Sequence, residues 1–411
     1  MNKKTKSTYQ YPLNSDTFNK KDFKDIKLSL EQNKYTMGEK VALFEKNFSK
    51  WLGVKNSVMV NSGSSANLLM IASLLYRSDK SKIKLKKGDE VIVPALSWST
   101  TVWPLIQLGL KPVFADICID SLAIDLVSAK KVITKRTKAI FLIHVLGQAC
   151  NMQKYINFCK KENLILIEDC CESFGAFYSN RTIGSFGHSG SFSHYYSHHL
   201  TTIEGGSIIT NDDSLANDLR SLRAHGWIRD RKDKKFFEKK YNYLDHRFLF
   251  LLPGFNVRPT EMQGILGLNQ LKRMEKFLNN RDYFVREIYN ILKDGPRWLK
   301  IIGDSFLNKK ISKYSNRSHS WMSIPLLITE DKYSSKKISS IFEKNGIETR
   351  PIISGNITKH PAFENIKYNS NVMLKNSNHI HKFGLMIGCH PSTINKPFYS
   401  FKSAINELKK L

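Results

Sequence analysis

Short apolar segments rich in valine and isoleucine recur along the chain, separated by longer segments with a different pattern. Apolar runs without polar alternation are typical of strands that are covered on both faces. The segments at 64–77 and 151–163 instead repeat their apolar residues at helical spacing. Alternating strands and helices predict an α/β fold with a mostly parallel sheet between helices. The expected strands are SVMVN (57–61), EVIVPA (90–95), PVFADI (112–117), AIFLIHVLG (139–147), LILIEDC (164–170), SFSHYY (191–196) and GSIIT (206–210).

The pattern changes near residue 275, where a long amphipathic helix is followed by shorter and more mixed segments. A chain of 411 residues exceeds the roughly 250–300 residues at which single cores stop growing. We therefore expect an N-terminal arm (1–20), a large domain (21–275) and a smaller α+β domain (276–411).

Composition and charge exclude several classes of protein. The formal net charge is +28, but the lysines are scattered in pairs, so we expect no nucleic-acid partner and a basic field that attracts anionic small molecules. The absence of a long apolar run predicts no membrane span, and the basic N-terminus lacks the apolar run of a secretory signal. The six cysteines lack zinc-ligand spacing, so we expect no metal, reduced thiols and a cytoplasmic location.

Several polar residues follow the predicted strands directly, at the edge where parallel sheets bind ligands. A turn containing Gly63 and Ser64 opens a helix, where backbone N–H groups bind phosphate, although serine-rich turns are also ordinary caps. Asp169 ends a core strand and could hold a protonated pyridine nitrogen or cap a helix. Trp98 could stack on a flat ring or pack in the core.

Together these features resemble the DegT/DnrJ/EryC1/StrS family of sugar aminotransferases, which depend on pyridoxal 5′-phosphate (PLP). The resemblance extends from TMGEKVALFEKNF (36–48) to the C-terminal helix and includes EDCCES, YSHHLTTIEGG, RAHGW and PGFNVRP. It implies the fold of PLP-dependent transferases of type I, like aspartate aminotransferase.

The resemblance also reveals a departure at the position of the cofactor-binding lysine. Family members place that lysine a few residues before GEGG, whereas this chain has His198 there and retains Glu204-Gly205-Gly206. An imidazole cannot form a covalent imine with PLP, so PLP or pyridoxamine 5′-phosphate (PMP) should bind noncovalently beside a histidine base. The adjacent His199 is the competing assignment. We favour His198 because it keeps the spacing to Ser193 and to EGG.

The resemblance assigns a role to each remaining site residue. The phosphate contacts are Gly63, Ser64 and Ser193 of one subunit and Asn256 of the other, so a homodimer with shared active sites follows. Trp98 would stack on the pyridine ring, Asp169 would bind its nitrogen, and Glu172 would contact its hydroxyl where aminotransferases usually carry Gln. The candidate sugar-nucleotide contacts are His225 and Arg229.

Family members with histidine at this position resemble 3-dehydratases. The implied reaction is glutamate-dependent C3 dehydration of a nucleotide-linked 4-keto-6-deoxyhexose, with GDP-4-keto-6-deoxy-D-mannose favoured, for dideoxysugar and surface polysaccharide synthesis. One alternative is a CDP-sugar 3-dehydrase, whose iron–sulfur cluster would need cysteines that 226–260 lacks. A second is an ordinary aminotransferase, although no lysine occurs between 161 and 232. A third is a catalytically silent PLP-binding regulator.

Overall fold

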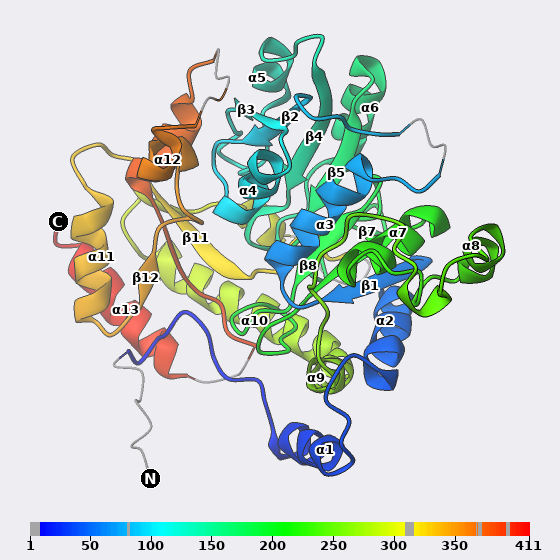
Figure 1. Ribbon diagram of the computed structural model, residues 1–411. Coiled ribbons are helices and arrows are strands. Elements are labelled where there is room, and N and C mark those ends of the chain that lie inside the picture. Colours follow the sequence, from blue (N-terminus) through cyan, green and yellow to red (C-terminus); the bar gives the residue numbers. More distant parts are fainter. Residues whose placement is uncertain (1–8, 80–82, 309–315, 367, 369–371, 392–394) are drawn as a thin grey trace.

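A seven-stranded sheet forms the centre of the molecule, as the apolar pattern predicts (Figure 1). The computed structural model describes residues 9–79, 83–308, 316–366, 368, 372–391 and 395–411. β9 runs opposite to the other six strands of this sheet, which are mutually parallel, so the α/β, mostly parallel prediction is confirmed. In spatial order the strands are β1 (Asn56–Val60), β9 (Gly206–Thr210), β8 (Gly190–Ser193), β5 (Ile165–Asp169), β4 (Thr137–Ile143), β2 (Glu90–Pro94) and β3 (Lys111–Ala115).

Helices cover both faces of this sheet. The central helix α3 (Gly63–Leu75) is apolar on nearly all sides and is buried against β8, β9, α4 and α7. By contrast, α8 (Lys234–Lys240) stands at the periphery of the ribbon (Figure 1). The other helices of this region are α1 (Lys20–Glu31), α2 (Glu39–Leu52), α4 (Ser99–Gln107), α5 (Leu126–Lys131), α6 (Met152–Glu162), α7 (Asp213–Arg223) and α9 (Glu261–Leu271), and a short hairpin pairs β6 (Phe177–Tyr178) with β7 (Arg181–Thr182).

A second, four-stranded antiparallel sheet lies in the C-terminal part of the chain. It contains, in spatial order, β10 (Leu299–Ile301), β11 (Ser323–Ile328), β13 (Gly384–Gly388) and β12 (Thr349–Arg350). The accompanying helices are α11 (Ser335–Lys344), α12 (Lys375–Phe383) and α13 (Lys396–Leu408). This smaller α+β part accords with the predicted fold class.

The long helix α10 (Met274–Lys293) passes between the two parts. Its first turns bury Met274 and Leu278 in the apolar core beside β8, and its later turns bury Phe284 in the core of the second sheet. The N-terminal segment reaches the same second core, where the Tyr11 hydroxyl donates to the carbonyl of Gly388 at 2.6 Å. The domain boundary near residue 275 stays a prediction, and residues 1–8 of the predicted arm lie outside the described part.

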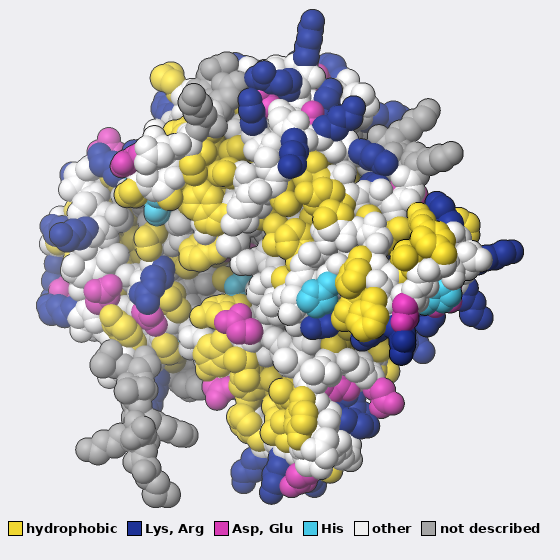
Figure 2. Space-filling model, viewed as in Figure 1, with side chains coloured by type: hydrophobic (Ala, Val, Ile, Leu, Met, Phe, Trp, Pro, Cys, Tyr) yellow, Lys and Arg dark blue, Asp and Glu magenta, His cyan; other side chains and the backbone are white. Residues whose placement is uncertain are grey.

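The basic side chains on the surface are scattered and do not form one patch on the visible face (Figure 2). Figure 2 shows lysine and arginine side chains spread around the visible face, with hydrophobic side chains between them. None of the described helices is both long and apolar enough to cross a membrane.

Candidate active site

A cavity of about 460 Å³ opens where the carboxyl ends of the parallel strands face the second sheet. The central sheet contributes the residues that follow β1, β2, β5 and β8, and the C-terminal part contributes Met322, Ile353 and Met386. Seven predicted site residues line this cavity: Gly63, Ser64, Trp98, Asp169, Glu172, Ser193 and His198.

The turn after β1 contributes Ser62, Gly63 and Ser64 to the cavity wall. Ser62 caps α3 by accepting a hydrogen bond from the Ser65 backbone at 3.0 Å, and the N–H groups of a first helical turn are suited to binding an anion. A Cβ atom on Gly63 would lie 2.6 Å from the Cβ atom of Ser193. Only glycine fits beside Ser193, so its backbone and the serine hydroxyls form one compact cradle.

Asp169 ends β5 with its carboxylate held by surrounding donors. Its Oδ2 accepts from Asn67 at 2.8 Å and from Thr101 at 2.7 Å, and its Oδ1 accepts from the Cys171 backbone at 3.0 Å. Asp169 is 4% exposed and lines the cavity. A buried carboxylate oriented in this way suits a cationic ring N–H donor in the cavity.

The donors around Asp169 were missed by sequence reasoning, which assigned no role to Asn67 or Thr101. A signal existed for Asn67, because it is a polar residue, 1% exposed, within the otherwise apolar centre of α3. Buried polar groups of this kind are nearly always hydrogen-bonded, so Asn67 could have been expected to have a partner at the end of a nearby strand.

Trp98 and Ile353 form part of the wall. The Trp98 side chain is 55% exposed at the beginning of α4, so its ring is available for stacking rather than packed in the core. Ile353 has a positive φ of 52°, an uncommon conformation for a β-branched residue. Sequence reasoning missed Ile353, Met322 and Met386 because they come from the distant C-terminal part.

The adjacent histidines face different environments. His198 lines the cavity, and its Nδ1 lies 2.7 Å from the carbonyl oxygen of Cys171. His199 is 2% exposed, and its Nε2 lies 3.1 Å from the carbonyl oxygen of Ser320 in the C-terminal part. The geometry therefore favours His198 over His199 as the group that meets a ligand.

The protonation of His198 follows from its surroundings. A carbonyl oxygen only accepts hydrogen bonds, so Nδ1 carries the proton and Nε2 keeps a free lone pair. Burial lowers the pKa of His198 from its ordinary value, although the Cys171 carbonyl and Asp169 oppose this effect. The imidazole is therefore a neutral base near pH 7.

The pKa of Glu172 is shifted upward, whereas that of His198 is shifted downward. Burial raises its pKa to about 7, while a hydrogen bond from the Leu146 backbone at 3.0 Å favours the charged form. This carboxyl can hold or release a proton near neutral pH.

Three predicted site residues lie elsewhere in this chain. Asn256 and Arg229 line a separate cavity of about 350 Å³, together with Arg258. His225 lies beside it, with its ring 5.0 Å from that of Trp227, over which the Arg229 guanidinium stacks at 4.4 Å. The chain therefore does not bring these residues to its own Asp169 cavity.

The fold and site define a member of a known enzyme family. Residues 16–400 match the DegT/DnrJ/EryC1/StrS aminotransferase family, and the chain belongs to this family. It is 39% identical to GDP-4-keto-6-deoxy-D-mannose 3-dehydratase of Escherichia coli O55:H7 over 388 residues, which cover 92% of this chain and 95% of that protein. It is 37% identical to the Yersinia pseudotuberculosis enzyme of the same name over 405 residues, covering 97% and 98% of the two chains.

A solved structure gives the same relationship. The crystal structure of GDP-4-keto-6-deoxymannose-3-dehydratase with a trapped PLP-glutamate geminal diamine superposes with a TM-score of 0.85 at 36% identity. The alignment covers 96% of this chain and all of that chain. The predicted type I transferase fold is thereby confirmed.

Proposed function

We propose that this chain is a PLP- and PMP-dependent 3-dehydratase acting on a nucleotide-linked 4-keto-6-deoxyhexose, GDP-4-keto-6-deoxy-D-mannose. L-Glutamate supplies the amino group and the two reducing electrons. The products are 2-oxoglutarate, ammonia and the GDP-linked 4-keto-3,6-dideoxy sugar, in which hydrogen replaces the C3 hydroxyl. The product would serve dideoxysugar and surface polysaccharide synthesis. The similarity to two 3-dehydratases across nearly the whole chain supports this proposal.

The residues of the Asp169 cavity fit PLP and PMP. The cradle at Gly63 and Ser193 suits a phosphate, Trp98 offers a ring face, and Asp169 suits the pyridine N–H. Glu172 would hold the ring hydroxyl region. When bound, the cofactor supplies an electron sink for breaking the C3–O bond of the sugar.

His198 carries the proposal because it occupies the cavity position at which the family places its lysine. No lysine side chain lines this cavity in the described part of the chain. Because the Cys171 carbonyl holds Nδ1, Nε2 would be the atom that accepts a proton from a bound cofactor. With no amine in the lining to bind the cofactor covalently, its amino form would stay available to the sugar ketone.

We further propose a homodimer with shared active sites. Asn256 would reach the phosphate of the partner's cofactor, and His225 and Arg229 would contact the sugar nucleotide. Their separation from the Asp169 cavity of the same chain supports a role across an interface. Exposed apolar side chains on helix α1, which protrudes from the ribbon (Figure 1), give further support, with Phe23 58% and Leu28 52% exposed.

We also propose that the enzyme works in the cytoplasm. All six cysteines are free thiols, which is typical of proteins in a reducing compartment.

The proposed function is tested by incubating the purified protein with PLP, L-glutamate and GDP-4-keto-6-deoxy-D-mannose, and measuring product mass and ammonia. We expect one equivalent of ammonia for each sugar that loses oxygen at C3. A sugar that retains both the C3 oxygen and a new amino group would instead identify an aminotransferase, and the absence of turnover would indicate a silent binder.

A further inference from the structure

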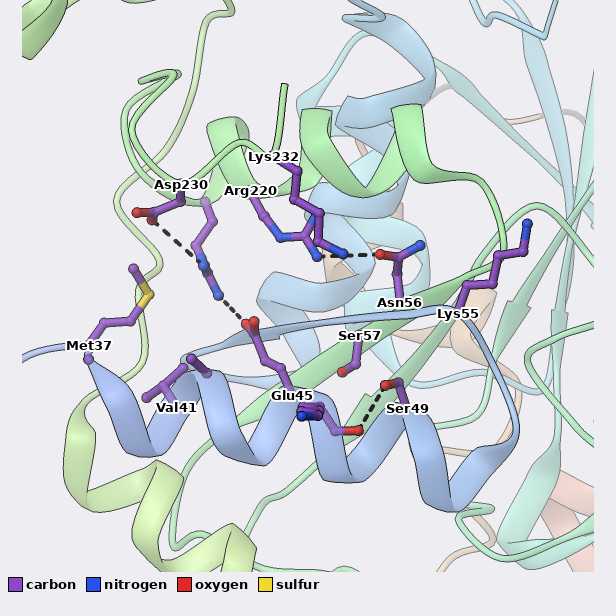
Figure 3. A pocket seen from close by; sticks show the side chains of 14 residues that line it. Met37, Val41, Glu45, Ser49, Lys55, Asn56, Ser57, Arg220, Asp230 and Lys232 are labelled. Carbon is purple, nitrogen blue, oxygen red and sulfur yellow. Dashed lines mark hydrogen bonds and ion pairs between the residues drawn. The ribbon is translucent and has the colours of Figure 1, made fainter. Parts of the chain in front are cut away.

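A second and larger cavity, of about 620 Å³, lies between α2, the beginning of β1 and α7 (Figure 3). It shares no lining residue with the Asp169 cavity. Its volume falls in the range of about 300–1,000 Å³ that is usual for small-molecule sites.

The lining of this cavity is strongly cationic. Two acidic residues, Glu45 and Asp230, face five basic ones. The basic residues are Lys46, Lys55, Arg220, Arg223 and Lys232.

Arg223 forms ion pairs with both acidic side chains. Its guanidinium lies 2.6 Å from Glu45 and 3.7 Å from Asp230. It also donates to the carbonyl of Met59 at 2.7 Å. The remaining four basic side chains therefore face the cavity without a balancing carboxylate in its lining.

Arg220 is the only buried residue of these four, at 8% exposed, whereas the three lysines are exposed. Its guanidinium contacts only amide oxygens, at 3.3 Å to Asn217 and 3.4 Å to Asn56, and forms no ion pair within the described residues. Asn56 is oriented for this contact, because its amide nitrogen donates to Asp213 at 2.7 Å. Burial lowers the pKa of Arg220, and nearby carboxylates, of which Glu45 acts most strongly, offset only part of this effect. An anion that pairs with the guanidinium directly would therefore be stabilised.

Lys232 lies beside Arg220 in the cavity wall (Figure 3). The backbone of Lys232 donates to the same Asn217 oxygen that Arg220 contacts, which holds Lys232 beside the guanidinium. A guanidinium beside an ammonium forms a suitable donor set for a phosphate group.

We propose that this cavity binds a phosphorylated small molecule, whose phosphate pairs with Arg220 and Lys232. The apolar side chains of Met37 and Val41 at the other wall would contact the uncharged part of the ligand. The site is distinct from the phosphate cradle at Gly63 and Ser193.

The test is calorimetric titration of the PLP-loaded protein with inorganic pyrophosphate, because saturating PLP occupies the Gly63 cradle. We expect Arg220→Gln to raise the dissociation constant at least tenfold and Lys232→Gln to raise it severalfold. Lys50→Gln is the matched control, since Lys50 is an exposed residue of α2 that does not line the cavity. Its dissociation constant should change less than twofold.

Thermal unfolding gives a second readout that loss of folding cannot imitate. Arg220→Gln should melt no lower than the wild type without ligand, because it removes a poorly paired buried charge, and pyrophosphate should no longer stabilise it. If Arg220→Gln does not fold, the double variant with Lys55→Gln and Lys232→Gln, both exposed residues, is titrated instead. We expect its affinity for pyrophosphate to fall tenfold. Wild-type affinity in the variants that fold, or no binding to the wild type, would overturn the proposal.

Discussion

The Nδ1 atom of His198 lies 2.7 Å from the carbonyl oxygen of Cys171, two residues beyond Asp169. This contact links the histidine to the same strand end that positions the buried carboxylate. It fixes the tautomer of the imidazole and turns Nε2 towards proton transfer. The adjacent His199 does not line the cavity, and its Nε2 lies instead beside the carbonyl oxygen of Ser320 in the C-terminal part.

Replacing His198 by Asn should remove the proposed base while leaving the cavity polar. We expect kcat for C3 dehydration to fall by about 10²–10⁴-fold, the usual contribution of a positioned base, with PLP binding changed only slightly. His199→Asn is the control, and should retain most of the activity while melting at a lower temperature. Equal losses of kcat in the two variants would contradict the assignment, and ammonia release under saturating substrate measures them.

Much of this account could be predicted from the sequence, because strand and site signals are local. The apolar runs before Asn61 and Asp169 located two strand ends of the central sheet, and the ligand-binding edge follows from parallel topology. Spacing to Ser193 already favoured His198 over His199, but only the folded turn shows that His198 lines the cavity while His199 contacts Ser320. The role of Thr101 also needed coordinates, because its bond to Asp169 spans 68 residues.

Thr101→Val tests whether the donors around Asp169 matter to the cofactor. The substitution removes the hydroxyl that donates to Oδ2 at 2.7 Å but keeps a similar shape. A lost hydrogen bond to a charged group costs about 1.5–3 kcal/mol, so we expect PLP affinity to fall by at least tenfold. Thr100→Val is the control, since the Thr100 hydroxyl makes no hydrogen bond to Asp169 within the described structure. Fluorescence titration with PLP should show near-normal affinity in the control, whereas similar losses in both variants would count against this role.

Glu172 should make stability depend on pH. Burial raises its pKa from 4.5 to about 7, so the folded state holds a proton that the unfolded state has released between these values. The stability that the folded protein gains by keeping Glu172 protonated is fully present below pH 4.5 and is lost as the pH rises through 7. Glu172→Gln should therefore stabilise the cofactor-free protein more at pH 8 than at pH 5, by at most about 3 kcal/mol.

Denaturant unfolding at the two pH values measures this difference. Wild type and Glu172→Gln should differ least at pH 5 and most at pH 8. Stability curves that stay parallel over this range would show that Glu172 does not take up a proton on folding.

Mixing two inactive variants tests the shared active sites. Asn256→Ala and His198→Asn should each be inactive or nearly so as homodimers, because each lacks one part of every site. Random reassembly of equal amounts should restore about a quarter of the wild-type sites, and ammonia release measures the recovery. Two preparations of the same variant, mixed in the same way, provide the control, and no recovery despite confirmed subunit exchange would place Asn256 in its own subunit's site or outside catalysis.

The replacement of the family lysine by His198 is tested most directly by the mass of the intact chain after PLP loading and borohydride reduction. Reduction makes any imine between PLP and a lysine permanent, so a covalent cofactor adds its mass to the chain. We predict an unmodified mass for the wild type and a single added cofactor for His198→Lys. A wild-type chain that carries one stoichiometric reduced cofactor would contradict the account.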